Sequence, residues 1–327
     1  MSEEKDAVTE KPDPAAVAAV PAAAVPPVTP PGFKSGFVTI VGRPSAGKST
    51  LLNRLVGEKI AITSDKPQTT RNRILGYVNR PNGQLAFIDT PGLIKPYLAM
   101  HTRMMSVAHS AIGEADVVIW MVDTTERDGP HNRPIADLLR QSGKPVILAL
   151  NKVDKVAKAQ LLPLMAGLGN RLAFKAVVPI SARNGDGVEI LLKAVLDQLR
   201  EGPALFPLDE FTDKSERFLV SELIREAIIH CCGQEVPYAT AVLVRAWEDE
   251  QADGGKIVIS ADIMLERDGQ KAIVIGKQGS MLKKIGSEAR TEIEAFLKAP
   301  VYLQLFVKVR KGWREDDRAV REVIEGR

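Results

Sequence analysis

The sequence of 327 residues has only two cysteines, Cys231 and Cys232, and they are neighbours in the chain. A pair at this spacing closes no long loop, which excludes a disulfide-framed secreted scaffold and favours a reducing compartment. The longest apolar runs, such as 115–122, are far shorter than the roughly 20 residues that span a bilayer, so a transmembrane protein is excluded. The four histidines show no metal-ligand spacing.

A large excess of positive or negative charge is also lacking. The chain has 44 basic and 41 acidic residues, a net charge of +3, so any nucleic-acid partner must be argued from where the charges lie. Residues 1–32 have eight alanines, seven prolines and no aromatic residue. Such a composition cannot offset the entropy of ordering, and we expect a disordered tail at 1–34. Acidic residues stand where a secretory signal has basic ones, so no signal peptide is expected.

Hydrophobic patterning predicts two domains. In 35–202, short apolar runs alternate with amphipathic stretches, which is typical of an α/β domain with a mostly parallel sheet and helices on both faces. The strands are expected at 37–41, 85–88, 117–122, 146–150 and 177–180. An aperiodic linker is expected at 203–214. The pattern of 215–327 predicts a smaller α+β domain, with a helix ending near Gly233, strands at 238–247 and 256–266, a helix at 281–297 and a strand at 301–309.

A phosphate-binding motif lies between the first predicted strand and a predicted helix. The sequence GRPSAGKS fits GxxxxGK[ST], in which glycines let backbone N–H groups approach phosphate oxygens. We expect Lys48 to reach the β- and γ-phosphates and the hydroxyl of Ser49 to bind Mg²⁺. The candidate phosphate-binding residues are Gly42, Arg43, Pro44, Ser45, Ala46, Gly47, Lys48, Ser49 and Thr50.

Three further motifs follow later strands, at the sheet edge where ligands bind in open α/β folds. Asp89, Thr90, Pro91 and Gly92 follow one strand, where Asp89 can hold Mg²⁺ and the Gly92 N–H can sense a γ-phosphate. Asn151, Lys152 and Asp154 follow another, and a carboxylate there accepts two hydrogen bonds from guanine but not from adenine. Ser181, Ala182 and Arg183 offer N–H groups to guanine O6. Taken singly, such residues also occur in ordinary turns and helix caps; the set predicts a GTP site.

Two features concern hydrolysis. The polar segment 64–71 carries Thr70 and Thr69, of which Thr70 is the first choice as a Mg²⁺ ligand that closes when a γ-phosphate is present. A solvated polar loop is the alternative. Leu93 stands where many GTPases carry a glutamine that orients the attacking water, and no arginine finger is identifiable. We therefore predict slow intrinsic hydrolysis.

A second candidate site lies in the smaller domain. Gly276 and Gly279 form a GxxG turn between an expected strand ending near Ile275 and the helix at 281–297, and such a turn can clamp a nucleic-acid backbone. No acidic residue occurs between Gly269 and Ser287, although 214–327 has 19 basic and 19 acidic residues. The candidate RNA-binding residues are Lys271, Ile275, Gly276, Lys277, Gln278, Gly279, Lys283 and Lys284.

A second basic cluster surrounds Trp313. The cluster consists of Lys308, Arg310, Lys311 and Arg314. In one interpretation these side chains and the indole stack on bases or clamp phosphates. In the other, they form a solvated strand end while Trp313 packs on the core. The two interpretations are equally favoured by the sequence.

These motifs together resemble the Era family of bacterial GTPases from about Gly36 to the C-terminus. The first half carries GRPSAGKS, QTTR at 68–71, DTPGL, NKVD and SAR. The second half resembles the KH domain of that family in SELIRE at 221–226, VPY at 236–238, IGKQGSMLKKIGSEAR at 275–290, APV at 299–301 and KVRKGWREDDRAVR at 308–321. Few GTPases carry this RNA module behind the first domain.

The resemblance implies a GTPase that binds GTP and GDP with Mg²⁺ and the 3′ end of small-subunit (16S) ribosomal RNA, and acts in maturation of the 30S subunit. It implies a cytoplasmic protein that also contacts the inner face of the membrane; we expect a monomer and no DNA partner. Ser45 replaces the family's usual asparagine, which leaves potassium dependence open. The alternatives are an RNA-binding assembly factor whose slowly hydrolysed GTP is mainly structural, a membrane-surface GTPase, and an RNA-modifying GTPase, for which no catalytic cluster is present.

Overall fold

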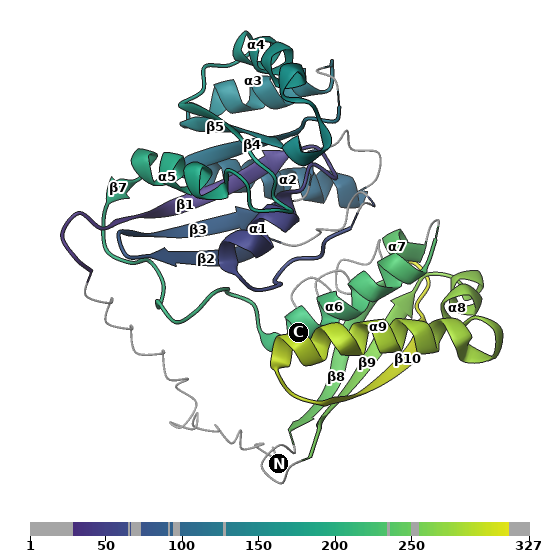
Figure 1. The fold of residues 1–327 in the computed structure, drawn as a ribbon. Helices are drawn as coiled ribbons and strands as arrows, with labels where there is room; N and C mark the ends of the chain where they lie inside the picture. Colours follow the sequence, from purple (N-terminus) through teal and green to yellow (C-terminus); the bar gives the residue numbers. More distant parts are fainter. Residues whose placement is uncertain are drawn as a thin grey trace, which may run out of the picture.

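Two sheets, each with its own helices, form the molecule in a computed structural model (Figure 1). The structure describes residues 29–64, 66, 73–90, 92–93, 99–126, 129–233, 236–249 and 255–313. The larger domain contains β1 Lys34–Gly42, α1 Lys48–Val56, β2 Ile74–Arg80, β3 Gly83–Asp89, α2 Ala99–Glu114, β4 Val117–Asp123, α3 Asn132–Ser142, β5 Val146–Asn151, α4 Leu161–Gly169, β6 Ala176–Pro179, α5 Val188–Gln198 and β7 Arg200–Glu201. The smaller domain contains α6 Glu216–Cys231, α7 Val236–Ala239, β8 Ala241–Asp249, β9 Ile257–Leu265, α8 Asp268–Ile275, α9 Ser280–Leu297 and β10 Val301–Val309.

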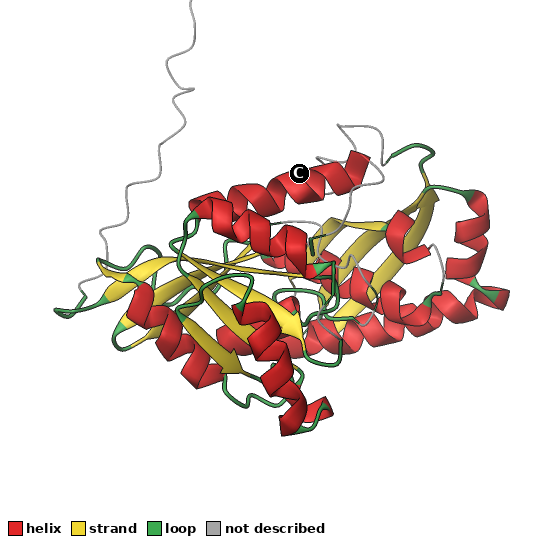
Figure 2. Ribbon diagram, turned by 90° about the horizontal axis from the view of Figure 1, so that it is seen from above, coloured by secondary structure: helices red, strands yellow, loops and turns green. Residues whose placement is uncertain are grey.

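The larger sheet has the strand order β2-β3-β1-β4-β5-β6, and β7 pairs with the start of β1. All pairings among β3, β1, β4, β5 and β6 are parallel, whereas β2 runs antiparallel to β3. Helices α1 and α5 cover one face, and α2, α3 and α4 cover the other; Figure 2 shows helices on both sides of this sheet. The predicted α/β class is confirmed, with β2 as an unpredicted strand.

The smaller sheet has the order β10-β9-β8, with β9 parallel to β10 and antiparallel to β8. Its core forms where α6 and α9 pack on one face, through side chains such as Ile224 and Ile285. The strand expected at 238–247 begins at Ala241, because 236–239 form α7. The strand expected to end near Ile275 is wrong: Asp268–Ile275 is the helix α8. A four-residue apolar run, AIVI, fits either element, and Gln270 Oε1 accepts the N–H groups of Glu266 and Arg267 at the helix start.

The segment 203–214 does not hang freely between the domains. Tyr77 N donates to Phe211 O at 2.8 Å and Thr212 Oγ1 donates to Leu75 O at 2.6 Å, so the segment follows the outer edge of β2. The ring of Phe206 stacks on Tyr77 with 4.1 Å between centroids. Beyond it, Phe218 and Leu219 at the start of α6 join the core of the larger domain. The second domain is thus packed against the first.

No helix among the described residues combines the length and apolarity needed to cross a bilayer. In the same residues, histidine, cysteine, aspartate and glutamate side chains nowhere gather in threes as a metal centre would require.

Candidate nucleotide and nucleic-acid sites

The loop from Gly42 to Gly47 connects β1 to α1, and its backbone needs glycine. Gly47 precedes the helix with φ +99°, and a Cβ there would collide with Asn151 Nδ2. A Cβ at Gly42 would collide with the carbonyl of Met121 on β4. Ser45 also has a positive φ, of 61°. The loop therefore wraps tightly around the N-terminus of α1, where helix N–H groups attract phosphate.

Lys48 lies inside this loop and is only 6% exposed. Its Nζ donates to Arg43 O at 3.0 Å and to Gly42 O at 3.4 Å. Burial lowers the pKa of Lys48 to about 8, although the nearby Asp89 carboxylate favours the charged form. An ammonium held among backbone carbonyls in this way is positioned to exchange them for phosphate oxygens.

Ser49 and Asp89 meet beside the lysine. Ser49 Oγ donates to Asp89 Oδ2 at 3.1 Å, and Asp89, the last residue of β3, is fully buried. A hydroxyl and a carboxylate are hard oxygen donors of the kind that Mg²⁺ takes beside a nucleotide. The remaining predicted metal ligand, Thr70, lies outside the described residues, as do its alternative Thr69 and the predicted Pro91.

The segment after β3 packs against the phosphate loop. Thr90 Oγ1 donates to Ile40 O at 3.0 Å, and Leu93 N donates to Gly42 O at 3.1 Å. A Cβ on Gly92 would lie 2.7 Å from Pro44 N. The side chain of Leu93 is buried in the core between β4, α2 and α3, and an alkyl side chain cannot orient a water.

The predicted guanine-binding residues divide into two roles. Asn151 is buried, with Nδ2 donating to Ala46 O at 2.7 Å and Oδ1 accepting Ala182 N at 2.9 Å. Its amide therefore joins the phosphate loop to the 181–183 loop. Asp154 is exposed, and its hydrogen bond with Ser181, the main cause, lowers its pKa. An ionised, exposed carboxylate at this place suits the guanine edge.

Lys152 and the 181–183 loop are held by residues that sequence reasoning missed. Lys152 has φ 67° and its Nζ lies 2.5 Å from Asp123 Oδ2. Arg54 on α1 donates to Ala182 O at 2.6 Å and to Arg183 O. No local sequence pattern signals this role, because the two partners lie 128 and 129 residues away in the sequence.

A cavity of about 640 Å³ opens over the loop. Its wall combines residues predicted to bind phosphate or guanine with residues that follow α1 in the chain and with a histidine of the smaller domain. They are Pro44, Ser45, Gly47, Lys48, Ser49, Thr50, Gly92, Lys152 and Arg183, with Ile62, Thr63, Ser64, Lys66 and His230. A nucleotide needs space of this order. The predicted Arg43, Ala46, Asn151, Asp154, Ser181 and Ala182 lie around this cavity without lining it.

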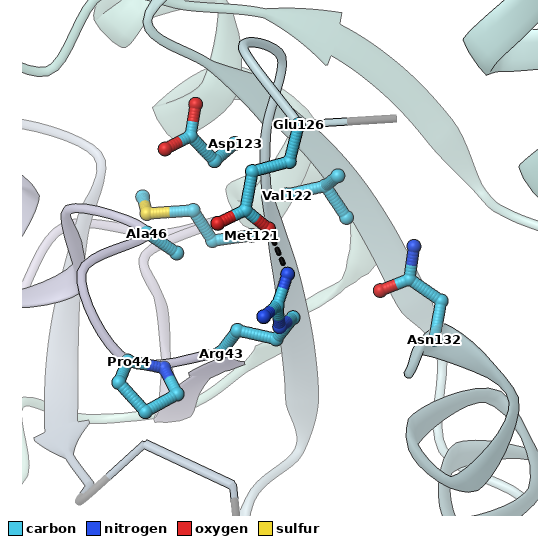
Figure 3. Close-up of a pocket in the computed structure, with 8 residues that line it drawn as sticks. All are labelled: Arg43, Pro44, Ala46, Met121, Val122, Asp123, Glu126 and Asn132. Carbon is cyan, nitrogen blue, oxygen red and sulfur yellow. Dashed lines mark hydrogen bonds and ion pairs between the residues drawn. The ribbon is translucent and has the colours of Figure 1, made fainter. Parts of the chain in front are cut away.

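Arg43 faces a different, smaller hollow, shown in Figure 3. Its guanidinium points to Glu126, with which it forms an ion pair, and Asn132 of α3 lies nearby. The hollow, of about 10 Å³, has room for about one water. In this structure Arg43 therefore fastens the phosphate loop to the segment after β4, through a glutamate that sequence reasoning did not single out.

The second candidate site lies between two helices. Gly276 ends α8 with φ 71° and ψ 178°, and Gly279 precedes α9 with φ 78°. Gln278 between them has φ 51°. The side chains of Lys277, Gln278, Lys283 and Lys284 are exposed, and those of Lys271 and Ile275 are half-buried. The N-terminus of α9 thus follows a glycine turn and lies next to exposed lysines, features that GxxG domains use to clamp a nucleic-acid backbone.

Trp313 belongs to the core. It is 2% exposed, packs with Ala241, Leu243 and Met264, and donates from Nε1 to Ala239 O at 3.2 Å. Lys308, exposed on β10, pairs with Asp262 at 2.7 Å. The interpretation in which Trp313 packs on the core is therefore correct for the indole. Arg314 lies outside the described residues.

Comparison with known proteins identifies both domains. A family model described as a 50S ribosome-binding GTPase matches residues 37–152, and a KH-domain model matches 235–314. The GTPase Era of Geobacter metallireducens is 51% identical over 291 residues, covering 89% of this chain and 97% of that protein.

Two solved structures of Era, each 40% identical, cover 89% of this chain. One, a single-residue variant from Aquifex aeolicus bound to GDP and AlF4⁻, has a TM-score of 0.85 and is covered over 99% of its length. The other, bound to MgGDPNP and nucleotides 1506–1542 of 16S ribosomal RNA, has a TM-score of 0.84 and is covered over 98%.

Proposed function

This chain belongs to the Era family of GTPases, and we propose that it is a slow GTP-hydrolysing switch that binds the 3′ end of 16S ribosomal RNA during assembly of the 30S subunit. The observation that carries the proposal is the presence, on one chain, of a nucleotide cavity around Lys48 and a basic GxxG turn at the start of α9. A relative with the same two domains binds MgGDPNP and 16S RNA together.

We assign the residues of the GTP site as follows. Lys48 neutralises phosphate charge, Ser49 and Asp89 hold Mg²⁺, and Asp154 accepts the hydrogen bonds of guanine. Bound Mg²⁺ would neutralise charge between the β- and γ-phosphates. Thr70, with Thr69 as alternative, supplies the response to the γ-phosphate. The burial of Leu93 supports slow turnover, and a comparison of hydrolysis in KCl and NaCl decides whether a site with Ser45 uses potassium.

The RNA site is tested with an oligonucleotide from the 3′ end of 16S RNA and two substitutions at Gly279. A Cβ there meets no atom within 4 Å, and Asp and Asn tolerate the left-handed φ of 78° better than other side chains do, so both variants should fold. We expect Gly279→Asp to weaken RNA binding at least tenfold, because the carboxylate repels phosphate, and Gly279→Asn to weaken it much less. A DNA strand of the same sequence should compete poorly. Equal binding by wild type and Gly279→Asp would place RNA elsewhere.

A mainly structural GTP is the second candidate, and the packing of Leu93 favours it. Single-turnover hydrolysis with and without 30S subunits separates the two: stimulation by the subunit supports the switch, and unchanged, barely measurable turnover supports the structural role.

We propose a cytoplasmic monomer. Glu288, Glu292 and Glu294 on α9 argue against docking of that helix on an anionic membrane, which vesicle sedimentation tests.

A further inference from the structure

One wall of the nucleotide cavity is held by the second domain. Residues 58–64 and 66 follow α1, and Ile62, Thr63, Ser64 and Lys66 line the cavity. The first part of this segment is fixed by its own domain, since Asn53 Oδ1 accepts the N–H groups of Ile60 and Ala61 at 3.1 and 2.9 Å. The second part makes hydrogen bonds to α6 as well as one within the segment, from Lys66 N to Ser64 Oγ at 3.1 Å.

Glu226 is the centre of these contacts. It lies on α6 and is 2% exposed. Its Oε1 accepts both the backbone N–H of Thr63 at 3.0 Å and the Thr63 hydroxyl at 3.1 Å, and its Oε2 lies 2.8 Å from Lys59 Nζ. A buried carboxylate is stable only with partners of this kind, so the pairing fixes Thr63 strongly.

The end of α6 adds three hydrogen bonds to the same segment. Lys66 Nζ donates to the backbone oxygens of Ile229 and Cys232, the second at 2.5 Å, and so places a cation at the negative end of the helix. His230 Nε2 lies 3.2 Å from Thr63 O, and the His230 side chain lines the cavity. The second domain therefore holds both Thr63 and Lys66.

The helix α9 connects this wall to the GxxG turn. His230 Nδ1 lies 2.9 Å from Glu288 Oε1, and Lys59 Nζ lies 2.7 Å from Glu292 Oε2. Both glutamates are on α9, which starts directly after Gly279. Burial opposes ionisation of Glu288, but hydrogen bonds from Cys231 and His230 outweigh it and lower the pKa of Glu288. The helix α9 thus carries the GxxG turn at one end and hydrogen-bonded carboxylates that face the cavity wall further along.

We propose that Glu226 is a positioning residue for the nucleotide site, through which nucleotide binding and RNA binding at 276–279 are coupled. The proposal rests on the function proposed above and assigns its regulation to named contacts. A shift of α9 on binding RNA moves Glu288 and Glu292, and with them the wall at Thr63; a change at Thr63 on binding nucleotide acts in reverse. Thermodynamic linkage makes the two effects equal in size.

The experiment measures the affinity for the 16S oligonucleotide with a GTP analogue and with GDP. We expect the ratio of the two affinities to be about fivefold or more in the wild type. In Glu226→Gln, which keeps the shape but removes the charge facing Lys59, the ratio should fall to near one while binding persists. Glu292→Gln, at a more exposed position, should reduce the ratio in part. The matched control is Glu216→Gln, an exposed position on the same helix, which should keep the wild-type ratio.

The outcomes separate the two proposals. Failure of the wild type to bind the RNA in either state overturns the proposed function. RNA binding that is equal in both states leaves that function intact and overturns the coupling. A wild-type ratio that persists in Glu226→Gln also overturns it. Thermal unfolding checks the fold of each variant, and Glu292→Gln decides the question if Glu226→Gln does not fold.

Discussion

The helices α1 and α9 begin in the same way, but the side chains around their N-termini differ. Both α1 and α9 follow a glycine in the left-handed region, Gly47 and Gly279, and neither has a side-chain cap, so both offer helix N–H groups to phosphate. Around α1, buried polar side chains bond to the loop: Lys48 to Arg43 O and Asn151 to Ala46 O. Around α9, the neighbouring lysines are exposed to solvent.

The difference fits two kinds of ligand. A preorganised, buried cradle suits a small molecule of fixed shape, because its donors do not have to be reordered on binding. An exposed turn with exposed lysines suits a long polyanion, whose backbone can be bound without an enclosing pocket. The same local backbone device therefore serves a specific nucleotide site and a nucleic-acid contact.

The test with the largest expected effect replaces one lysine of each site with methionine. Lys48→Met should lower nucleotide affinity about 100- to 1000-fold, because charge-assisted bonds to phosphate are lost. The nucleotide-free protein should not lose stability, since a costly buried ammonium is removed. Lys277→Met is the matched control, and it should weaken RNA binding and leave nucleotide binding unchanged. Isothermal titration with both ligands measures this; equal losses in both variants would refute the contrast.

The second test compares the two glycines of the RNA turn. Gly276 has φ 71° with ψ 178°, and a Cβ there would lie 2.7 Å from Met281 Cβ, whereas a Cβ on Gly279 meets nothing within 4 Å. Gly276→Ala should therefore lower the free energy of unfolding by about 1–3 kcal/mol, and Gly279→Ala by about 1 kcal/mol. Urea unfolding of both variants gives the difference. An equal loss of unfolding free energy in both variants would show that the backbone conformation and close contact at Gly276 do not specifically require glycine.

The third test uses pH. Because the pKa of Lys48 is about 8, the Lys48 side chain of the nucleotide-free protein becomes neutral as the pH rises through 8, and phosphate binding must then take up a proton. We expect nucleotide affinity to fall about tenfold between pH 7 and 9, with about half a proton taken up per nucleotide at pH 8. Calorimetry in buffers of different ionisation enthalpy measures the uptake, and Lys48→Met should show none.

The smallest effect concerns guanine selection. Ser181→Ala removes the hydrogen bond that lowers the pKa of Asp154. The carboxylate loses a positioning contact, so the preference for GTP over ATP should fall about two- to tenfold. Competition binding measures the ratio, with Ser142→Ala at the end of α3 as control. An unchanged ratio would mean that Asp154 is positioned without the serine.

The larger sheet was predictable because its central strands are mostly apolar and four of the five expected strands end at a motif with its own chemistry. The strand β2 was missed because Gly76 and Asn79 interrupt its apolar pattern. The helix α8 was mistaken for a strand because its short apolar run fits both periods.

The individual roles in the site were less accessible. Placing Asn151 near guanine followed from its motif, but its bonds to Ala46 and Ala182 depend on how three loops meet. The contacts of Glu226 could not be read from the sequence at all, since Thr63 lies 163 residues away. Local patterns show which residues follow a strand, but only the packed structure shows which distant segments share a buried charge.

The course of the 203–214 segment also bears on solubility. As an outer strand, β2 would otherwise offer its backbone donors and acceptors to a strand of another molecule, the usual start of sheet-to-sheet aggregation. Phe211, Thr212 and Asp213 occupy those groups, the last by accepting Leu75 N at 3.0 Å. The connection between the domains is therefore also a protective cover, and lengthening it with flexible residues would promote self-association of the exposed edge as well as domain motion.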